Sequence, residues 1–297
     1  MLARGVLVDV EGQRPFGRAP QAWKGALLAA AFLLAGCAQQ TPVAIAGAQV
    51  EAAAKDAPTP TLGLEGEGSQ PSATPAPTLP QVGRQYETSR PAVVWGTRLS
   101  RLPTTRKVVA LTFDAGANAD GVPSILRTLQ ATGTPATFFL TGKWVQTYPQ
   151  LALEIGHGYQ VGNHTYDHPY LPQLPDAAVR KEIVAAGTMI ASATGHDPRP
   201  LFRFPYGDGD ARTIAIANQL GYSCIQWTVD TKGWRGISGG QTVDSVVSRV
   251  MANLEPGEIV LMHVGSAGDH STLDADALPR SIAALKAQGY SFTTLTS

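Results

Sequence analysis

The chain of 297 residues has little charge and almost no cysteine. Charged residues make up 15% of it, and 23 basic residues balance 23 acidic ones, so the formal net charge is zero. A neutral chain lacks the basic surface that nucleic-acid binding requires, and we expect no nucleic-acid partner. Cys37 and Cys224 are the two cysteines. Because Cys37 lies in a processing signal, we expect no disulfide, and Cys224 fits a small buried side chain on a strand.

The apolar run near the N-terminus, Gly25–Leu34, is too short to cross a bilayer as a helix. Basic residues precede it and small residues follow it, which is typical of an export signal. The segment Leu34-Ala-Gly-Cys37 resembles the bacterial lipoprotein signal, in which the cysteine becomes the lipidated N-terminus. We therefore expect a signal peptide over residues 1–37 and an extracytoplasmic protein anchored to the membrane by lipid on Cys37. The alternative is an ordinary signal peptide and secretion.

Residues 38–90 have almost no periodic apolar pattern and are rich in Ala, Pro, Thr and Gly. Such a segment buries too little apolar surface to offset the entropy of an ordered chain, so we expect a disordered linker. The periodic remainder, residues 91–297, is expected to form one catalytic domain.

From Lys107 onward, strand-like and helix-like segments alternate. Repeated strand-then-helix units predict a parallel sheet covered by helices. Trp227 lies inside one predicted strand, and we expect it in the core. The predicted strands are Val108–Phe113, Ala136–Leu140, Gly158–Gly162, Leu201–Phe204, Ser223–Val229, Glu258–Met262 and Ser291–Leu295, and the predicted helices are Gly121–Ala131, Thr147–Ile155, Asp176–Ala193, Ala211–Leu220, Thr242–Leu254 and Asp276–Gln288.

The segment His164-Thr-Tyr-Asp-His168 places two histidines four residues apart, where one metal ion could take both imidazoles. Alone the pair is a weak signal, because this spacing also arises by chance. Polar residues capable of chemistry stand at the ends of four predicted strands, which is how α/β barrels assemble active sites. We therefore expect a closed barrel rather than an open sheet. These strand-end residues are Asp114, Arg203, Asp230 and His263.

Five motifs, in this order, resemble those of the polysaccharide deacetylases of the NodB-homology type, carbohydrate esterase family four. The resemblance implies a distorted (β/α)7 barrel and the metal-assisted removal of acetyl groups from sugars. It covers nearly all of the chain from Lys107 to its end. The motifs are Thr112-Phe-Asp-Ala-Gly116, His164-Thr-Tyr-Asp-His168, Arg203-Phe-Pro-Tyr-Gly207, Asp230-Thr-Lys-Gly-Trp234 and Leu261-Met-His263.

The resemblance assigns roles to the first three motifs. Asp114 would be the general base, and Arg203 would pair with it and orient it. His164 and His168 would bind a divalent metal ion, for which zinc is the first expectation and cobalt or nickel are alternatives. Amide hydrolysis at neutral pH needs a nucleophile, and a divalent ion supplies one by lowering the pKa of water.

The resemblance also implies an acid and a substrate groove. His263 would protonate the departing amine, and the backbone N–H of Tyr206 would help to hold the oxyanion. Leu261 would line the acetyl pocket. Asp230 and Trp234 would form one side of the groove, and an acid in that motif tunes the histidine.

Two positions depart from the family pattern. Ala115 stands where members usually carry the aspartate of an Asp-His-His metal site, and Gly233 stands where a second acid is common. Three outcomes follow for the metal. Asp120 could act as the substitute ligand, water could complete a weaker site, or the metal could be absent and the domain only bind glycan.

Taken together, the sequence predicts a monomeric hydrolase that removes N-acetyl groups from a cell-wall or extracellular polysaccharide. Peptidoglycan is the first expectation, because a lipid anchor would keep the enzyme near the wall, and a chitin-like polymer is the second. Removal of O-acetyl groups from xylan is a same-chemistry alternative. A non-catalytic glycan-binding module is the alternative of a different class.

Overall fold

The computed structural model describes residues 95–296. The predicted signal peptide, Cys37 and the predicted linker all lie outside these residues. Among the described residues, no helix is both long enough and apolar enough to cross a membrane.

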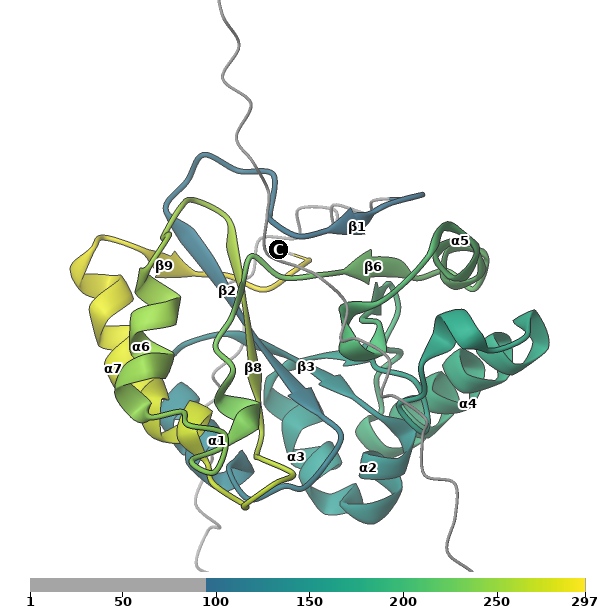
Figure 1. Ribbon diagram of the computed structural model, residues 1–297, viewed down its shortest axis with the longest axis horizontal. Helices are drawn as coiled ribbons and strands as arrows, with labels where there is room; N and C mark the ends of the chain where they lie inside the picture. The colour runs from purple at the N-terminus through teal and green to yellow at the C-terminus, as the bar shows by residue number, and fades with distance from the viewer. Residues whose placement is uncertain (1–94, 297) are drawn as a thin grey trace, which may run out of the picture. The chain divides into compact units, whose positions relative to one another are not determined.

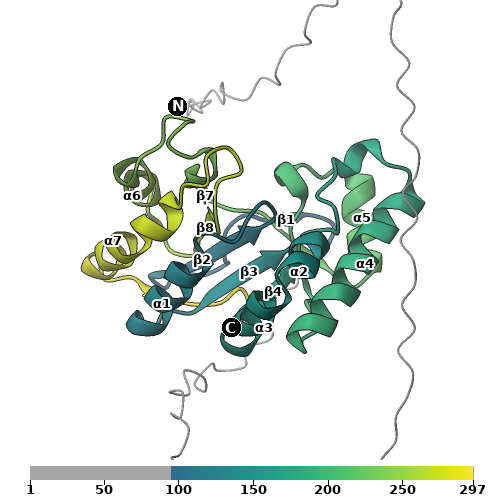
Figure 2. The same ribbon diagram turned by 90° about the horizontal axis from the view of Figure 1, so that it is seen from below.

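One parallel sheet forms the centre of the described chain, with helices around its outside (Figure 1). The strands pair in the order β1-β6-β5-β4-β3-β2-β8-β7, and β9 pairs with β2. Seen from the second direction, the sheet is curled rather than flat (Figure 2). The strands are β1 (Arg98–Leu99), β2 (Val108–Ala115), β3 (Ala136–Leu140), β4 (Gln160–Asn163), β5 (Leu201–Phe202), β6 (Ser223–Ile225), β7 (Val229–Asp230), β8 (Glu258–His263) and β9 (Ser291–Phe292).

The helices follow the strands in sequence and cover the outer face of the sheet. In both views α6 and α7 lie together on one flank, and α4 and α5 lie on the other (Figures 1 and 2). Three short 3-10 helices lie in the connecting loops of residues 95–296. The helices are α1 (Val122–Thr132), α2 (Gly142–Thr147), α3 (Pro149–Gly158), α4 (Asp176–Thr194), α5 (Ala211–Gln219), α6 (Val243–Met251) and α7 (Leu273–Ala287), with η1 (Leu171–Gln173), η2 (Pro205–Gly207) and η3 (Gly233–Arg235).

Residues 226–228 link two distant parts of the sheet. This segment joins β6 to β7, which pair with different neighbours. The N–H of Gln226 donates to the carbonyl of Leu99 on β1 at 2.8 Å, and the N–H of Thr228 donates to that of Ile259 on β8 at 2.8 Å. The short segment therefore bridges the two sides of the curled sheet, but β1 and β7 do not pair with each other, so the sheet is a half-barrel and not the closed barrel expected. The predicted α/β fold with a distorted barrel is confirmed.

Alternation along β2 shows how the sheet separates core from site. Val109, Leu111 and Phe113 are fully buried in the cluster shared with the surrounding helices. Because successive side chains of a strand point to opposite faces, Thr112 and Asp114 point into the barrel instead. Both polar side chains are nonetheless buried. The apolar outer face packs the strand against the helices, and the inner face presents the polar side chains of Thr112 and Asp114.

Several predicted elements were wrong in detail. The helix predicted over 147–155 corresponds to α3, which begins at Pro149, and the short helix α2 just before it was not predicted. The predicted strand over 223–229 is interrupted, and Trp227 lies in the interruption, partly buried, rather than in the core. Helix α7 begins three residues earlier than predicted, at Leu273. Strand β1 was missed because two residues carry no periodic signal.

Candidate active site

The carboxyl ends of β2, β4, β5, β7 and β8 open onto one cavity of about 400 Å³. In parallel sheets these ends meet at one edge, and the loops that follow them build the site. The cavity gathers eight of the residues predicted from the sequence. They are Asp114, His164, His168, Tyr206, Asp230, Trp234, Leu261 and His263.

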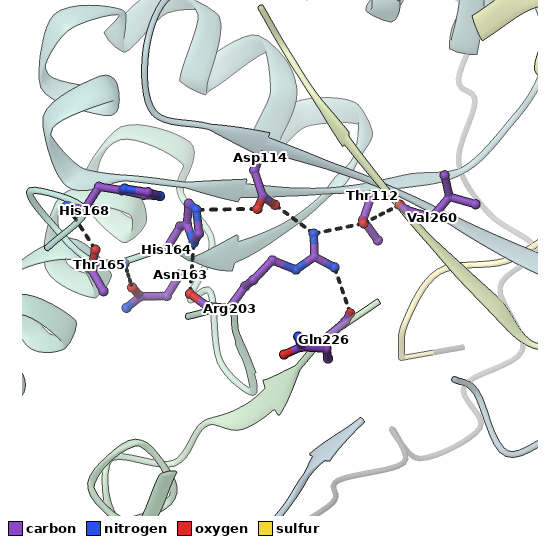
Figure 3. Close-up of polar contacts among 9 residues, drawn as sticks. All are labelled: Thr112, Asp114, Asn163, His164, Thr165, His168, Arg203, Gln226 and Val260. Atoms are coloured by element: carbon purple, nitrogen blue, oxygen red, sulfur yellow. Dashed lines mark hydrogen bonds and ion pairs between the residues drawn. The ribbon is translucent and has the colours of Figure 1, made fainter. Parts of the chain in front are cut away.

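Arg203 lies behind the cavity and holds Asp114 (Figure 3). Its Nη1 donates to Asp114 Oδ1 at 2.7 Å and to the hydroxyl of Thr112 at 2.9 Å, and its Nη2 donates to the carbonyl of Gln226 at 3.2 Å. The Arg203 side chain is fully buried, and its guanidinium lies 4.1 Å from the centre of the Phe139 ring. Burial lowers the pKa of Arg203, whereas the charge of Asp114 opposes that shift. The pair therefore fixes a carboxylate at the cavity wall.

His164 is held between two oxygen atoms (Figure 3). Its Nδ1 lies 2.9 Å from the carbonyl oxygen of Arg203, and its Nε2 lies 3.4 Å from Asp114 Oδ2. Burial lowers the pKa of His164 to about 4, so the ring is neutral at pH 7. A neutral imidazole carries one proton and can donate to only one of the two oxygens. The other nitrogen then turns a lone pair toward an oxygen.

The loop after β4 carries His168 in a strained backbone conformation. His168 has φ 60° and Thr165 has φ 66°, values that are uncommon outside glycine. Hydrogen bonds hold the loop: Asn163 Oδ1 accepts from the N–H of Thr165 at 2.9 Å, and the Thr165 hydroxyl accepts from that of His168 at 3.1 Å. Glu182 adds two more hydrogen bonds, because its carboxylate accepts from the N–H groups of Tyr166 and Asp167. This bracing places the His168 ring against that of His164, with ring centres 4.8 Å apart.

The two histidines fit a divalent cation, although the aspartate usual in the family is missing. Within residues 95–296, no three His, Cys, Asp or Glu side chains gather as a complete metal site. However, when Nδ1 of His164 carries the proton, the lone pair on its Nε2 faces the Asp114 carboxylate, which is repulsive. A cation placed beside Nε2 would remove this repulsion. The carbonyl contact at Nδ1 is also how metal-binding histidines are oriented in general. Burial lowers the pKa of His168 to about 4, so it too offers a neutral nitrogen.

Tyr206 presents its backbone N–H from a tight turn. It has φ 59° inside η2, directly after Pro205. The hydrogen bonds of this turn are donated by the N–H groups of Gly207 and Asp208, which leaves the N–H of Tyr206 out of them. Its side chain is 67% exposed and lies against His168, with ring centres 4.7 Å apart. Gly207 is required here because a Cβ at that position would lie 2.4 Å from the Trp227 ring.

His263 ends β8 directly beside Asp114 of β2, since the two residues are register partners. Burial lowers the pKa of His263 to about 4, against the charge of Asp114, which raises it. The indole of Trp234 stands 6.2 Å from the imidazole, centre to centre, and is 45% exposed. Its Nε1 donates to Asp230 Oδ2 at 3.4 Å. Burial raises the pKa of the Asp230 carboxyl.

The proposed substitute ligand, Asp120, and the position of the missing aspartate, Ala115, both lie outside the cavity lining. Asp120 is not among the residues that line the cavity, and its Oδ2 lies 2.8 Å from Nδ1 of His270. Its role as a substitute ligand stays a prediction that requires it to leave His270. Ala115 is fully buried in the apolar cluster under the helices. One further residue, Asp274, was not predicted from the sequence: its carboxyl accepts a hydrogen bond from the backbone N–H of His263.

Comparison with known proteins agrees with this geometry. The family model for polysaccharide deacetylase matches residues 101–225. A peptidoglycan-N-acetylglucosamine deacetylase of Bacillus cereus is 34% identical over 66% of this chain and 69% of its own length. The chain belongs to the polysaccharide deacetylase family. The prediction of this family, and with it of a hydrolase acting on non-peptide carbon–nitrogen bonds, is confirmed.

Two further relatives widen the comparison. A chitooligosaccharide deacetylase of Bradyrhizobium is 34% identical over 60% of this chain and 80% of its own length. The crystal structure of a carbohydrate esterase family 4 pseudoenzyme from Bacillus anthracis matches with a TM-score of 0.62 and 32% identity, over 68% of this chain and 69% of that one. A mutant described as having restored enzymatic activity matches equally well, at 33% identity. The family therefore includes both deacetylases and a pseudoenzyme.

Proposed function

We propose that this protein removes N-acetyl groups by metal-assisted hydrolysis from a cell-wall or extracellular polysaccharide, either peptidoglycan or a chitin-like polymer. The observation that supports this most is the retained pair of Asp114 and His263. These two residues stand side by side on β2 and β8 and open onto one cavity, so a base and an acid reach the same bond. A module that only bound glycan would have no use for a buried arginine that orients the base.

His164 and His168 are the residues that would hold a divalent metal ion, with zinc as the first choice and cobalt or nickel as alternatives. When bound, such an ion lowers the pKa of water and polarises the acetyl carbonyl. The chain itself prepares both rings as neutral ligands, because burial lowers the pKa of each to about 4. Water would fill the position that Ala115 leaves without a carboxylate.

The protons of the reaction are moved by two residues. Asp114 would take a proton from the attacking water as its oxygen bonds to the acetyl carbon. Arg203 holds the Asp114 carboxylate in place for this step through the 2.7 Å contact. His263 would then give a proton to the sugar nitrogen as the carbon–nitrogen bond breaks, leaving acetate and a free amine. The backbone N–H of Tyr206 would donate to the oxyanion.

The rim of the cavity suits a sugar. Tyr206 and Trp234 are exposed aromatic side chains at its border, and aromatic faces pack against sugar rings. Leu261 lines the cavity although only 3% of its surface is exposed. It would contact the acetyl methyl group. Asp230 would fix the orientation of the Trp234 indole. The names of the two deacetylase relatives support N-acetylated glucosamine polymers as the substrate class.

The same proposal covers the part of the chain outside the described residues. Residues 1–37 would be a lipoprotein signal, Cys37 the lipid-bearing residue, and residues 38–90 a linker to the catalytic domain, 91–297. The protein would then act as a membrane-anchored, extracytoplasmic monomer. Hydrolysis of O-acetyl groups on xylan is the alternative within the same chemistry.

A second candidate function, glycan binding without turnover, is favoured by Ala115. Alanine at this position cannot supply the charged metal ligand that is usual in the family, and one structural relative is named a pseudoenzyme. The whole chain should be assayed for acetate release from N-acetylglucosamine oligomers, peptidoglycan and acetylated xylan, after chelation and again with zinc, cobalt or nickel. We expect metal-dependent release from the first two substrates.

Two variants make the assay specific. Asp114→Asn should abolish acetate release, whereas Asp244→Asn, at an exposed aspartate paired with Arg280, should leave it unchanged. Glycan binding without acetate from any substrate or metal would refute the enzyme and establish the binding module. Release from xylan alone would establish the esterase.

A further inference from the structure

The Asp274 carboxyl occupies the space that a side chain at Gly233 would take. A Cβ on Gly233 would lie 2.3 Å from Oδ1 and 2.4 Å from Cγ of Asp274. The Gly233 backbone does not require glycine, because its φ is not among the positive values of the chain. What excludes a larger residue is therefore the Asp274 carboxyl itself.

Asp274 comes from the first turn of α7 and is almost fully buried, with 2% of its surface exposed. Its Oδ2 accepts a hydrogen bond from the backbone N–H of His263 at 2.8 Å. A buried carboxyl requires strong compensation, because leaving water is costly for a charged group. The contact with His263 is thus a built feature that joins α7 to the end of β8.

Two buried polar atoms at this place have no hydrogen-bond partner in the part of the chain that is described. They are Oδ1 of Asp274 and Nδ1 of His263. Native proteins satisfy most such atoms, and two unsatisfied atoms on residues that another hydrogen bond already joins invite a functional explanation. An imidazole nitrogen and a carboxyl oxygen are complementary as hydrogen-bond donor and acceptor, so a direct or water-mediated contact between them would satisfy both.

His263 needs an anion to serve as an acid. Burial lowers its pKa to about 4, so without compensation the ring has no proton to give at neutral pH. Asp274 has the opposite problem, since burial raises its pKa to about 7. A contact between the two groups would oppose both pKa shifts, because a negative carboxylate stabilises the protonated ring and the positive ring stabilises the carboxylate.

We propose that Asp274 is the positioning residue of His263: its carboxyl, delivered by α7 into the space beside Gly233, orients the imidazole and keeps it protonated for proton transfer. This proposal rests on the proposed function, because it assigns His263 a proton to give. Asp274 does not line the cavity, so it would act through His263 and not on the substrate.

The geometry allows a transposition test. Removing the Asp274 side chain and adding an aspartate at position 233 puts a carboxyl in roughly the same place from the opposite wall. We would measure kcat and KM for acetate release by the wild type, Asp274→Asn, Asp274→Gly, Gly233→Asp and the double variant Gly233→Asp/Asp274→Gly. Asp276→Asn is the matched control, since this aspartate lies in the same turn of α7 but is exposed.

We expect Asp274→Asn and Asp274→Gly to lower kcat at least tenfold with KM changed less than twofold, as for other groups that orient a reacting side chain. Gly233→Asp alone should be inactive or unfolded because of the 2.3 Å overlap. The double variant should recover kcat to within about fivefold of the wild type. A role in packing alone would leave kcat unchanged in Asp274→Asn, which keeps the shape of the side chain, and that result would overturn the proposal.

A second readout separates this proposal from the proposed function. The ring nitrogen shifts of His263, assigned by comparison with His263→Gln in histidine-labelled protein, report its protonation and hydrogen bonding without turnover. If the wild type releases no acetate, the proposed function fails while the ring shifts still decide the coupling. Shifts that are the same in the wild type and Asp274→Asn would refute it.

Discussion

Glu258 provides a test of the energetics that is independent of the site. This residue begins β8 at the end opposite the cavity and is 1% exposed. Neither carboxyl oxygen has a hydrogen-bond partner within residues 95–296. Burial raises the pKa of Glu258 from 4.5 to about 7, although the nearby Arg101 opposes the shift. The change that tests this is Glu258→Gln, which keeps the shape and removes the ionisation.

The sign of the effect follows from where the proton is held more tightly. The folded protein binds the Glu258 proton more strongly than the unfolded chain, so ionisation destabilises the fold. The penalty is nearly absent below pH 4.5, grows as pH rises, and is fully present above pH 7. At about 1.4 kcal/mol per pKa unit it reaches about 3 kcal/mol. Between pH 5 and pH 8 the wild type should therefore lose about 2 kcal/mol relative to Glu258→Gln.

Urea unfolding at pH 5 and pH 8, followed by circular dichroism, measures this difference. Glu154→Gln is the control, because Glu154 is an exposed glutamate on α3. Ionisation of an exposed carboxyl costs the fold no burial penalty, so Glu154→Gln should show the same pH dependence as the wild type. The reasoning is refuted if Glu258→Gln and the wild type show the same pH dependence, because then the buried carboxyl is not penalised.

Two more predictions concern the cavity. Ala115→Asp should tighten zinc binding at least about tenfold in calorimetry, whereas Ala115→Asn should not, because position 115 ends β2 directly after Asp114 and a longer, charged side chain there would leave the apolar cluster and add an oxygen ligand; equal dissociation constants would place position 115 outside the metal site. Trp234→Ala should raise KM about five- to tenfold with little change in kcat, the expected loss of one aromatic contact. Trp95→Ala, at an exposed tryptophan outside the cavity lining, is the control, and a matching KM in both variants would contradict the sugar-platform role.

The elements with long periodic patterns could be predicted from the sequence, and the ones that depend on tertiary contacts could not. Ala136–Leu140 and the start of α4 at Asp176 agree with their predicted bounds, because apolar spacing and the neighbouring Pro175 define them locally. Strand β1 depends on pairing with β6, more than 120 residues away along the chain, and has no local signal. Trp227 looked like a strand residue because the segment around it is rich in β-branched and apolar residues, but the crossing from β6 to β7 places it at the cavity.

The site shows the same division. Strand-end residues such as Asp114 and His263 could be predicted because a parallel sheet must bring its carboxyl ends together. Asp274 could not, because it lies in a helix whose predicted start was two residues beyond it, and its partner is Gly233, a residue with no side chain to attract notice. A glycine in a motif that usually carries an acid was the available signal. It pointed to a loss, whereas the structure shows the space filled.

The two departures from the family pattern therefore have different consequences. At Gly233 the missing acid leaves room that the Asp274 carboxyl occupies, so the environment of His263 keeps a carboxyl group. At Ala115 no carboxyl takes the place of the missing one: the methyl group packs in the apolar cluster, and Asp120 is engaged by His270. We therefore expect proton transfer to be intact and metal affinity to be the weak point of this protein. Excess zinc should then raise its activity, while the Asp274 variants should stay impaired at every zinc concentration.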